Sequence, residues 1–323
     1  GTMECLTEDE RGLVAGYVLN RFRGDAGLLA PANAFLRERT GRDVLGVVPY
    51  LPELGLPEED SVTFKNGEIL PETPPVDPER LDIAVIDLPH VSNFTDLDAL
   101  AVEADVRLRR VTAAERLGRP DAVILPGSKN TLADLAWLRE SGLADAISAL
   151  AATKETEIVG VCAGLQMLGE TVGDPLGLES RRGEMPGLGL LPLVTTLAAD
   201  KTLALTEAVH APTGLPLHGY EIHHGVTTSR DGLAVAVSRA DGTPMGYARG
   251  DAPVWGVYLH GLFDADAFRR AFCDGLRRRR GLPAIERTAA YDIEPALDRL
   301  ADALEASLRL DTLVRIIGLE AKG

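Results

Sequence analysis

Short apolar runs alternate with amphipathic segments between residues 81 and 173. The runs place hydrophobic residues at successive positions, which is typical of parallel strands buried on both faces. The segments between them repeat their apolar residues at helical spacing. The expected strands are residues 81–89, 106–111, 121–127 and 158–161, and the expected helices are residues 96–104, 131–142 and 163–173. The pattern predicts an α/β fold with a mainly parallel central sheet covered by helices.

The pattern changes in the second half of the chain. From about residue 187 to residue 260, shorter strand patterns follow one another directly, as in LLPLVTT, GLAVAVS and PVWGVYLHG. This succession predicts mixed or antiparallel sheet. The remaining residues return to helical spacing, in DADAFRRAFCDGLRRRR and then in EPALDRLADALEASLRLDTLVRII.

The beginning of the chain predicts a smaller unit. Two buried strands, at residues 12–20 and 42–50, flank a helix at residues 26–40 and form one βαβ unit. The stretch EILPETPPVDPERL then places four prolines among acidic residues, as in a stiff connector. The predicted organisation is a small α/β unit at 1–67, a linker at 68–80, the main domain at 81–275 and a helical segment at 276–323.

Composition and charge exclude several classes of partner. The net charge is −16 and the isoelectric point is near 4.8, so we expect no nucleic-acid or anionic-membrane partner. The basic run Arg277–Arg280 is expected to be a solvated helix end. No apolar stretch approaches the length of a membrane span, and the first residues are not typical of a signal peptide. Three widely spaced cysteines favour a reducing cytoplasm, and a homo-oligomer is compatible with the sequence.

The candidate nucleophile is Cys162, in the segment EIVGVCAGLQMLG at residues 157–169. It stands where an expected strand becomes a helix, and ligands of open α/β sheets bind at the carboxyl ends of strands. The pattern G-x-C-x-G is the cysteine counterpart of the serine nucleophile elbow. A buried structural cysteine is the alternative that this pattern leaves open.

A cysteine nucleophile needs a base, and His260 is the best candidate because it also ends an apolar strand. A structural role for this histidine stays open at this point. A third loop, ILPGSKNT, follows another strand, and its backbone N–H groups could stabilise an oxyanion together with the N–H of Ala163. This loop lacks the spacing of a phosphate-binding loop.

The other cysteines and histidines carry less information. The stretch LHGYEIHHG gathers three histidines and Glu221, but without the i, i+4 spacing of a helical metal site, so we expect no metal there. Cys273 lies in a helix near two phenylalanines and is expected to be core. Cys5, near the start of the chain, indicates nothing specific.

Five separated stretches occur together in one order. They are IAVIDLPHVSNFTD, LPGSKNT, GVCAGLQMLG, GYEIH and VWGVYLHGLFD. This set resembles class I glutamine amidotransferases, and more closely the C-terminal half of the cobyric acid synthases of cobalamin biosynthesis. The resemblance implies a flavodoxin-like fold in which Cys162 attacks glutamine and His260 is its acid–base partner. It also implies that the Gly127 and Ala163 amides hold the oxyanion, and that Gln166, Tyr220 and His223 bind the substrate.

Two positions depart from the amidotransferase pattern. Many class I members have His-x-Glu, whereas this chain has His260-Gly261-Leu262. Since the cobyric acid synthase branch is similar in lacking that glutamate, we expect a Cys–His dyad, with Glu221 left open as a substitute. His224 stands where that branch usually has methionine.

The front of the chain resembles the back part of the ATP-binding domain of those synthases, which is similar to dethiobiotin synthetase. Asn20, Arg21 and Asp25, in VLNRFRGD, resemble a base-recognition stretch, but no phosphate loop accompanies them. We therefore expect a C-terminal fragment that binds no cofactor itself. The resemblance implies that the full enzyme uses ATP and Mg²⁺ to amidate adenosylcobyrinic acid a,c-diamide, and that the corrinoid binds through the missing N-terminal domain. Alternatives are a cobyrinic acid a,c-diamide synthase, a peptidoglycan-lipid amidotransferase subunit and a non-catalytic binding or scaffold module.

Overall fold

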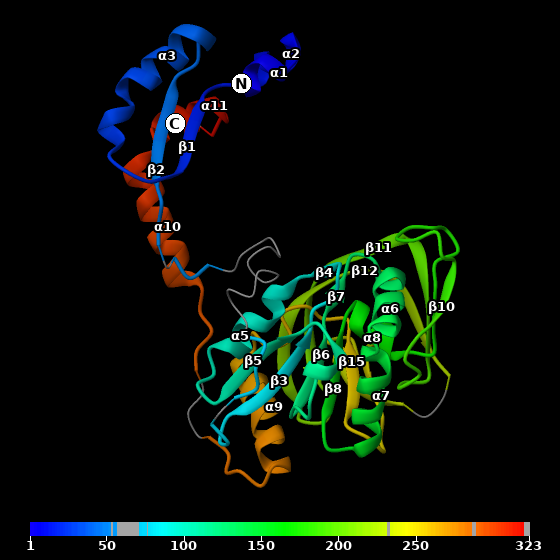
Figure 1. Cartoon of the computed structure of the whole chain (residues 1–323). Helices are drawn as coiled ribbons and strands as arrows, with labels where there is room; N and C mark the ends of the chain where they lie inside the picture. The colour runs from blue at the N-terminus through cyan, green and yellow to red at the C-terminus, as the bar shows by residue number, and fades with distance from the viewer. Residues whose placement is uncertain (53, 57–70, 76, 231–232, 286–288, 320–323) are drawn as a thin grey trace. The chain divides into compact units, whose positions relative to one another are not determined.

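The computed structural model describes residues 1–52, 54–56, 71–75, 77–230, 233–285 and 289–319 (Figure 1). The chain forms two compact units. Unit 1 consists of Gly1–Leu56 and Asp292–Gly323, and unit 2 consists of Pro57–Tyr291. The predicted connector at 68–80 lies partly outside the described residues, which omit 68–70 and 76. Within the described ranges, no helix has both the length and the apolar character needed to cross a membrane.

Unit 1 is built on two parallel strands, β1 (Tyr17–Phe22) and β2 (Val44–Pro49). The 3-10 helix η1 (Ala26–Leu29) and the helix α3 (Ala30–Thr40) connect them, and α3 ends at Gly41 in the left-handed conformation, with φ 70°. The predicted βαβ unit is therefore confirmed.

The first strand begins later than predicted because a helix occupies its expected start. Thr7 and Glu10 form a capping box, in which each side chain accepts the backbone N–H of the other residue. This box starts α2 (Glu8–Leu13), which follows the short helix α1 (Thr2–Cys5). The first two residues of the predicted strand at 12–20 therefore lie in a helix, which extends to Leu13.

The last two helices, α10 (Glu294–Ser307) and α11 (Leu310–Ile316), belong to unit 1. The Arg309 N–H donates to the Leu45 carbonyl at 2.9 Å, and Leu308 forms an isolated bridge with Gly46 in β2. A Cβ at Gly46 would lie 2.4 Å from the Ser307 carbonyl oxygen, so glycine permits this approach. The prediction of one helical segment at 276–323 is wrong, because these long-range contacts join its two helices to the start of the chain.

The centre of unit 2 is a parallel sheet in the order β5-β3-β6-β8-β15. Its strands are β3 (Leu81–Ile86), β5 (Val106–Val111), β6 (Ala122–Leu125), β8 (Glu157–Val161) and β15 (Val254–Val257). Numbered along the chain, this order is 2-1-3-4-5, the flavodoxin-like arrangement. Every residue of β3, β6 and β15 is buried, which confirms the prediction of parallel strands covered on both faces.

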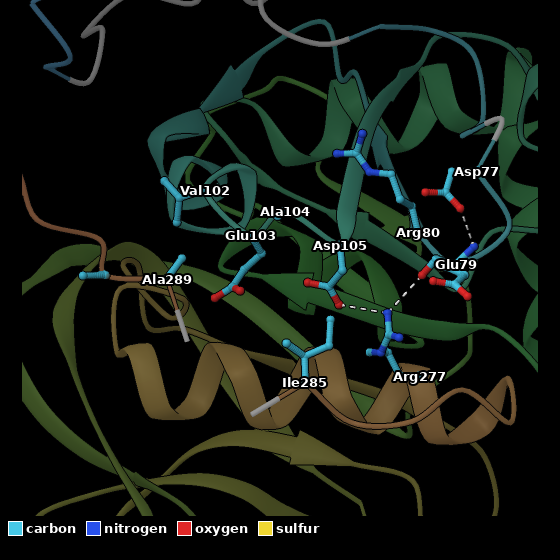
Figure 2. A pocket seen from close by; sticks show the side chains of 11 residues that line it. Asp77, Glu79, Arg80, Val102, Glu103, Ala104, Asp105, Arg277, Ile285 and Ala289 are labelled. Atoms are coloured by element: carbon cyan, nitrogen blue, oxygen red, sulfur yellow. Dashed lines mark hydrogen bonds and ion pairs between the residues drawn. The ribbon is translucent and has the colours of Figure 1, made fainter. Parts of the chain in front are cut away.

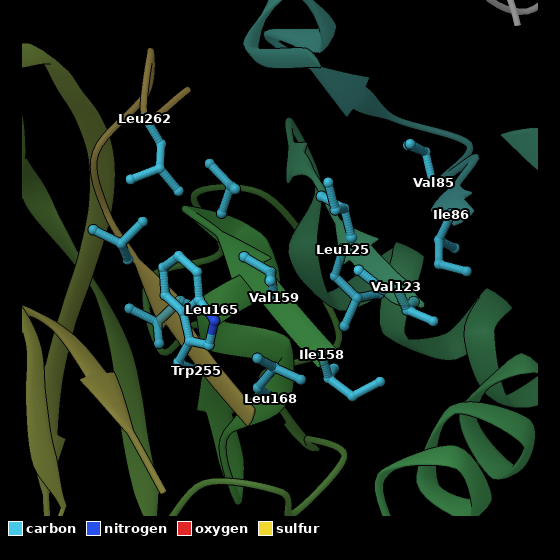
Figure 3. Close-up of a cluster of buried hydrophobic side chains, with 14 of the residues drawn as sticks. Val85, Ile86, Val123, Leu125, Ile158, Val159, Leu165, Leu168, Trp255 and Leu262 are labelled. Atoms are coloured by element: carbon cyan, nitrogen blue, oxygen red, sulfur yellow. The ribbon is translucent and has the colours of Figure 1, made fainter. Parts of the chain in front are cut away.

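Helices pack against this sheet and complete the core (Figure 1). They include α5 (Asp98–Ala101), α6 (Thr131–Glu140), α7 (Leu143–Thr153), α8 (Ala163–Leu168) and α9 (Asp266–Arg279). Figure 3 shows the apolar side chains of the strands meeting those of α8, among them Val123, Ile158, Leu165 and Trp255. The sequence pattern did not predict α7, although its buried leucines and isoleucine recur at helical spacing.

The sheet continues beyond β15 as mainly antiparallel strands, as predicted. The added strands are β9 (Thr171–Gly173), β10 (Glu184–Pro186), β11 (Leu193–His210), β12 (Leu215–Ser229), β13 (Ala234–Arg239) and β14 (Pro244–Ala248). The predicted helix at 163–173 is too long, since α8 ends at Leu168 and Thr171–Gly173 pairs with β11. The Gly169 N–H still bonds back to Gln166, but Gly169 itself is extended, with ψ 179°.

The arginine run at the end of α9 has one buried member. Arg277 is buried against Asp105 at 3.2 Å, and Arg280 lies 3.2 Å from Asp121. Arg279 is paired with Glu157. Arg278, Arg279 and Arg280 are exposed, so the expectation of a solvated helix end holds for these three residues and fails for Arg277, which is paired with a carboxylate from a distant part of the chain.

Candidate active site

Cys162 is the residue at which β8 becomes α8. Its backbone has φ 53° and ψ −107°, a conformation that a non-glycine residue adopts only under strain. A Cβ at Gly160 would lie 2.5 Å from the Gly164 carbonyl carbon, and one at Gly164 would lie 2.0 Å from the Leu125 carbonyl oxygen. Only glycine fits at these two positions. The strand-to-helix elbow predicted from G-x-C-x-G is present.

The elbow brings Cys162 to His260. The side chains of Cys162 and His260 lie close enough to interact, since Cys162 is among the groups that raise the pKa of His260, and the Cys162 sulfur lies 3.8 Å from the Ile222 carbonyl oxygen. The two side chains belong to the buried part of the unit, with Cys162 6% exposed and His260 1% exposed. Since β8 and β15 are neighbouring parallel strands, the residues that follow them meet at one edge of the sheet.

Strand β12 holds His260 from the other side. The His260 N–H donates to the Tyr220 carbonyl at 2.9 Å, and the Tyr220 N–H donates back to the His260 carbonyl at 3.1 Å. The two rings are stacked, with centroids 5.1 Å apart and planes 20° from parallel. Tyr220, predicted to bind substrate, therefore also fixes the plane of the imidazole.

Asp96 is a candidate functional residue that the sequence reasoning missed. Its Oδ2 lies 2.7 Å from Nδ1 of His260, and its Oδ1 accepts the Gly261 N–H at 2.8 Å. Asp96 is buried in the short 3-10 helix η2 (Phe94–Leu97), whose preceding residue Asn93 is left-handed with φ 52°. The prediction of a Cys–His dyad is wrong, because this carboxylate arrives from a loop 164 residues earlier than His260. The stretch SNFTD belongs to one of the five stretches that resemble the amidotransferases, and it was the signal in the sequence that could have pointed to Asp96.

The charge of Asp96 decides the protonation of His260. Burial by itself would lower the pKa of the imidazole, but the charge and hydrogen bond of Asp96, with smaller contributions from Cys162, raise it to about 10. The ring is therefore an imidazolium at neutral pH.

The predicted oxyanion residues lie beside this pair. Gly127 opens the two-residue strand β7 (Gly127–Ser128), which pairs with β4 (Val91–Ser92). A Cβ at Gly127 would lie 3.1 Å from Cε1 of His260, so the backbone passes directly against the ring. Ala163 is the first residue of α8, where helix N–H groups have no partner within the helix. The structure thus gathers both residues around Cys162, and their role stays a prediction.

The predicted substrate residues surround the start of α8. Gln166 is 3% exposed, and its amide lies 3.3 Å from the Thr131 hydroxyl and 3.4 Å from the Tyr258 hydroxyl. The ring of His223 stacks on Tyr258, with centroids 3.9 Å apart. A Cβ at Gly225 would lie 2.3 Å from Nε2 of Gln166. Three separate segments therefore converge on the Gln166 side chain.

Glu221 has partners of its own. Its oxygens accept Nε of Arg239 at 2.8 Å and the Thr206 hydroxyl at 3.0 Å, and His223 lies 3.4 Å away. Burial would raise the pKa of Glu221, but the hydrogen bonds from His223 and Arg239 lower it to about 2. The open alternative that Glu221 orients His260 is wrong, since Asp96 occupies that place.

The histidines of LHGYEIHHG do not converge on one point. Nδ1 of His223 faces the Gly225 carbonyl at 2.9 Å, whereas Nδ1 of His224 faces the Ala198 carbonyl at 3.0 Å. Among the described residues, no group of three or more histidine, cysteine, aspartate or glutamate side chains could hold a metal ion.

A cavity of about 700 Å³ lies elsewhere in unit 2 (Figure 2). Its walls include Glu79, Arg80 and Asp105, which come just before β3 and β5, together with Arg277 of α9. These are the amino ends of the strands, opposite the edge that carries Cys162 and His260. Figure 2 shows the Arg277 side chain directed at the Asp105 carboxylate and the Glu79 backbone carbonyl, to both of which it donates.

A cysteine on an elbow, a histidine held by a carboxylate and a flavodoxin-like sheet together define a class I glutamine amidotransferase. The chain belongs to the family of CobB/CobQ-like glutamine amidotransferase domains, whose model matches residues 82–268. The predictions of this fold and of an enzyme of this class are confirmed.

Curated relatives refine the comparison. The chain is 48% identical over 362 residues to a cobyric acid synthase of Nitratidesulfovibrio vulgaris, covering 100% of this chain and 66% of the relative. It is 43% identical over 332 residues to a cobyric acid synthase of Salmonella arizonae, covering 98% and 64%. A solved structure titled as a glutamine amidotransferase matches with a TM-score of 0.47 and 18% identity, over 60% of this chain and 97% of that one. The chain spans just under two thirds of the length of these two synthases, and the predicted resemblance to them is confirmed.

Proposed function

We propose that unit 2 hydrolyses L-glutamine through a glutamyl thioester on Cys162 and supplies the ammonia for amidation of corrinoid carboxylates. The observation that carries the proposal is the contact chain from Cys162 through His260 to Asp96 at the carboxyl edge of the sheet. The chemistry of a cysteine nucleophile needs a paired histidine whose ring a third group orients.

In the first half of the reaction, the Cys162 thiolate attacks the side-chain amide carbon of glutamine. The carbonyl π electrons move onto oxygen, where the N–H groups of Gly127 and Ala163 stabilise the negative charge. The C–N bond then breaks as the His260 imidazolium gives its Nε2 proton to the departing nitrogen. Ammonia leaves, and a thioester remains on Cys162. Gln166 seats the substrate beside the elbow.

In the second half, His260 is neutral and acts as a base. It takes a proton from water as the water oxygen attacks the thioester carbon, and the C–S bond breaks to release glutamate and the thiolate. Asp96 keeps Nδ1 protonated throughout, so that Nε2 is the nitrogen that exchanges protons. Each cycle thus returns the imidazolium–thiolate pair.

The proposed use of the ammonia follows from the relatives. Both relatives named above are cobyric acid synthases, which favours amidation of adenosylcobyrinic acid a,c-diamide over the a,c-diamide synthase, peptidoglycan-lipid and scaffold alternatives. ATP and Mg²⁺ are the cofactors proposed for that step. At the carboxyl ends of β1 and β2, Arg21 and Arg23 lie over the ring of Tyr50 at 5.8 and 3.9 Å, and neither contact indicates a ligand. We therefore derive no step through ATP or Mg²⁺ from this chain.

A glutaminase assay tests the proposal. The chain should release ammonia and glutamate from L-glutamine, Cys162→Ala should abolish this release, and the exposed control Cys5→Ala should keep it. In a full-length synthase, the variant matching Cys162→Ala should still amidate the corrinoid with added ammonia, because that route bypasses the thioester. Glutamine hydrolysis that survives in Cys162→Ala would overturn the proposal.

A further inference from the structure

Strand β11 has an open edge along its middle part. On one side, Thr202–His210 pairs with β12. On the other side, β11 pairs with β9 only at Val194–Thr196 and with β13 only at Ala208–His210. Among the described residues, no strand pairs with that side between Leu197 and Glu207. An edge of this kind presents N–H and C=O groups to a further strand.

The backbone groups of Leu203 and Leu205 face this open edge. The Glu207 carbonyl accepts the N–H of Ala240, the residue after β13, at 3.1 Å, so it points away from β12. Backbone groups alternate in direction along a strand, and the register with β12 is regular over this stretch. The N–H and C=O groups of both leucines therefore point the same way as the Glu207 carbonyl.

The same stretch carries exposed apolar side chains. Leu203 is 73% exposed and Leu205 is 92% exposed. They stand opposite Ile222 and Tyr220 of β12, so these four residues share one face of the two strands. Native edge strands usually avoid such apolar side chains, because they promote pairing with another chain. Exposed leucines beside an open edge therefore favour the addition of a strand here.

The sequence of this stretch matches itself when it is reversed. It reads KTLALTE from Lys201 to Glu207, and both of these end residues are exposed. Two antiparallel copies centred on Ala204 place lysine opposite glutamate, threonine opposite threonine and leucine opposite leucine. In this register Leu203 of one copy exchanges backbone hydrogen bonds with Leu205 of the other, which are the residues that face the open edge. Charge, apolar character and hydrogen-bond direction thus agree on one register.

We propose that the open edge of β11 binds a second copy of this chain, which adds its own β11 in antiparallel orientation about a two-fold axis at Ala204. A two-fold contact needs a surface that is complementary to itself, and the reversed match supplies one. The four leucines of the two copies cover one another, and the pair of Lys201 with Glu207 occurs twice. A partner of another sequence would not require this symmetry, so the residues favour the second copy as the occupant.

A single cysteine tests the register. In a Cys5→Ala background, which removes the exposed native thiol, Ala204→Cys should form an intermolecular disulfide under mild oxidation. The reason is that directly opposite residues of a non-hydrogen-bonded pair have Cα atoms about 4.5 Å apart, within the range of a disulfide. Thr202→Cys is the matched control, because its two copies would lie about 13 Å apart along the strands. Equal cross-linking of both variants, or none in Ala204→Cys, on a non-reducing gel would overturn the proposal.

Charge reversal tests the paired ends. Sedimentation velocity over a range of protein concentrations gives the dimer Kd of the whole chain. Lys201→Glu should raise this Kd about 10- to 100-fold, because like charges then oppose each other at both ends of the contact. The double variant Lys201→Glu/Glu207→Lys should restore it, since each pair is then inverted. Lys154→Glu, an exposed reversal at the end of α7, should leave it unchanged.

Two results of the sedimentation series would contradict the proposal. One is a chain that stays monomeric at every concentration, which would leave the edge to an occupant other than a second copy. The other is a double variant that dimerises no more tightly than Lys201→Glu, which would show that the two residues do not face each other.

Discussion

Replacing Asp96 by asparagine is the sharpest perturbation of the site. Asparagine keeps the size of the side chain and one oxygen for the Gly261 N–H, but it removes the negative charge beside Nδ1 of His260. Burial lowers the pKa of the His260 imidazole, and in this variant no negative charge of Asp96 compensates for that effect. The buried ring of Asp96→Asn should therefore be neutral at pH 7, and the imidazolium–thiolate pair should be lost.

The size of the effect follows from the pKa of His260. Its ordinary value is 6.5 and its value in the folded protein is about 10. Since each pKa unit is worth about 1.4 kcal/mol, the charged ring contributes on the order of 4 kcal/mol to folding at pH 7. Breaking a buried ion pair by removing one partner costs a similar amount, roughly 3–5 kcal/mol. The loss of an acid–base group of this kind lowers turnover by about 10²- to 10⁴-fold.

Two assays measure the expected losses of turnover and of stability. The first is the kcat/KM of glutamine hydrolysis as a function of pH, which should fall in Asp96→Asn and lose its alkaline limb near pH 10. The second is urea unfolding. Because the folded pKa of His260 is raised, its contribution is complete below about pH 6.5 and is lost as the pH rises toward 10. The gap in unfolding free energy between wild type and variant should therefore be largest at pH 6 and shrink by pH 9.5.

Asp145→Asn, on the exposed side of α7, is the matched control and should change neither assay. Wild-type kcat/KM in Asp96→Asn would refute the assignment of Asp96. A stability loss of the same size at every pH would show that Asp96 supports the loop through the Gly261 N–H and does not set the charge of His260.

Three further predictions concern the surroundings of the site. Gly164→Ala should lower the free energy of unfolding by about 3 kcal/mol or more in urea titrations, because its Cβ would lie 2.0 Å from the Leu125 carbonyl oxygen. Glu221→Gln should destabilise the protein at pH 6 but much less at pH 2.5, because a pKa lowered to about 2 gives stability that is present above 4.5 and is lost as the pH falls toward 2. Burial raises the pKa of Cys273 to about 12, so iodoacetamide should modify the exposed Cys5 and spare Cys273 in the native protein at pH 8, as peptide mass spectrometry would show.

The elbow and the strand ends could be predicted from the sequence because their signals are local. Gly160, Cys162 and Gly164 lie within five residues, and the apolar runs before Cys162 and His260 identify strands whose ends carry them. Parallel packing then brings those ends to one edge without further information.

The failures come from contacts between distant parts of the chain. Asp96 joins His260 across 164 residues, and nothing in SNFTD alone names its partner. The same is true of α10 and α11, whose amphipathic pattern predicts helices but does not say that Leu308 pairs with Gly46. The strand β9 replaces the end of a predicted helix because β11 supplies its hydrogen bonds. In each case contacts with distant residues, which the local sequence does not specify, decided the outcome.

The central claim is that Cys162 is the nucleophile that attacks glutamine. The glutamine analogue 6-diazo-5-oxo-L-norleucine alkylates such a residue, and peptide mass spectrometry locates the modification. The account predicts label on Cys162 alone, prevented by excess L-glutamine and absent in Cys162→Ala. Label on Cys273 or Cys5, or full labelling in the presence of excess L-glutamine, would contradict it.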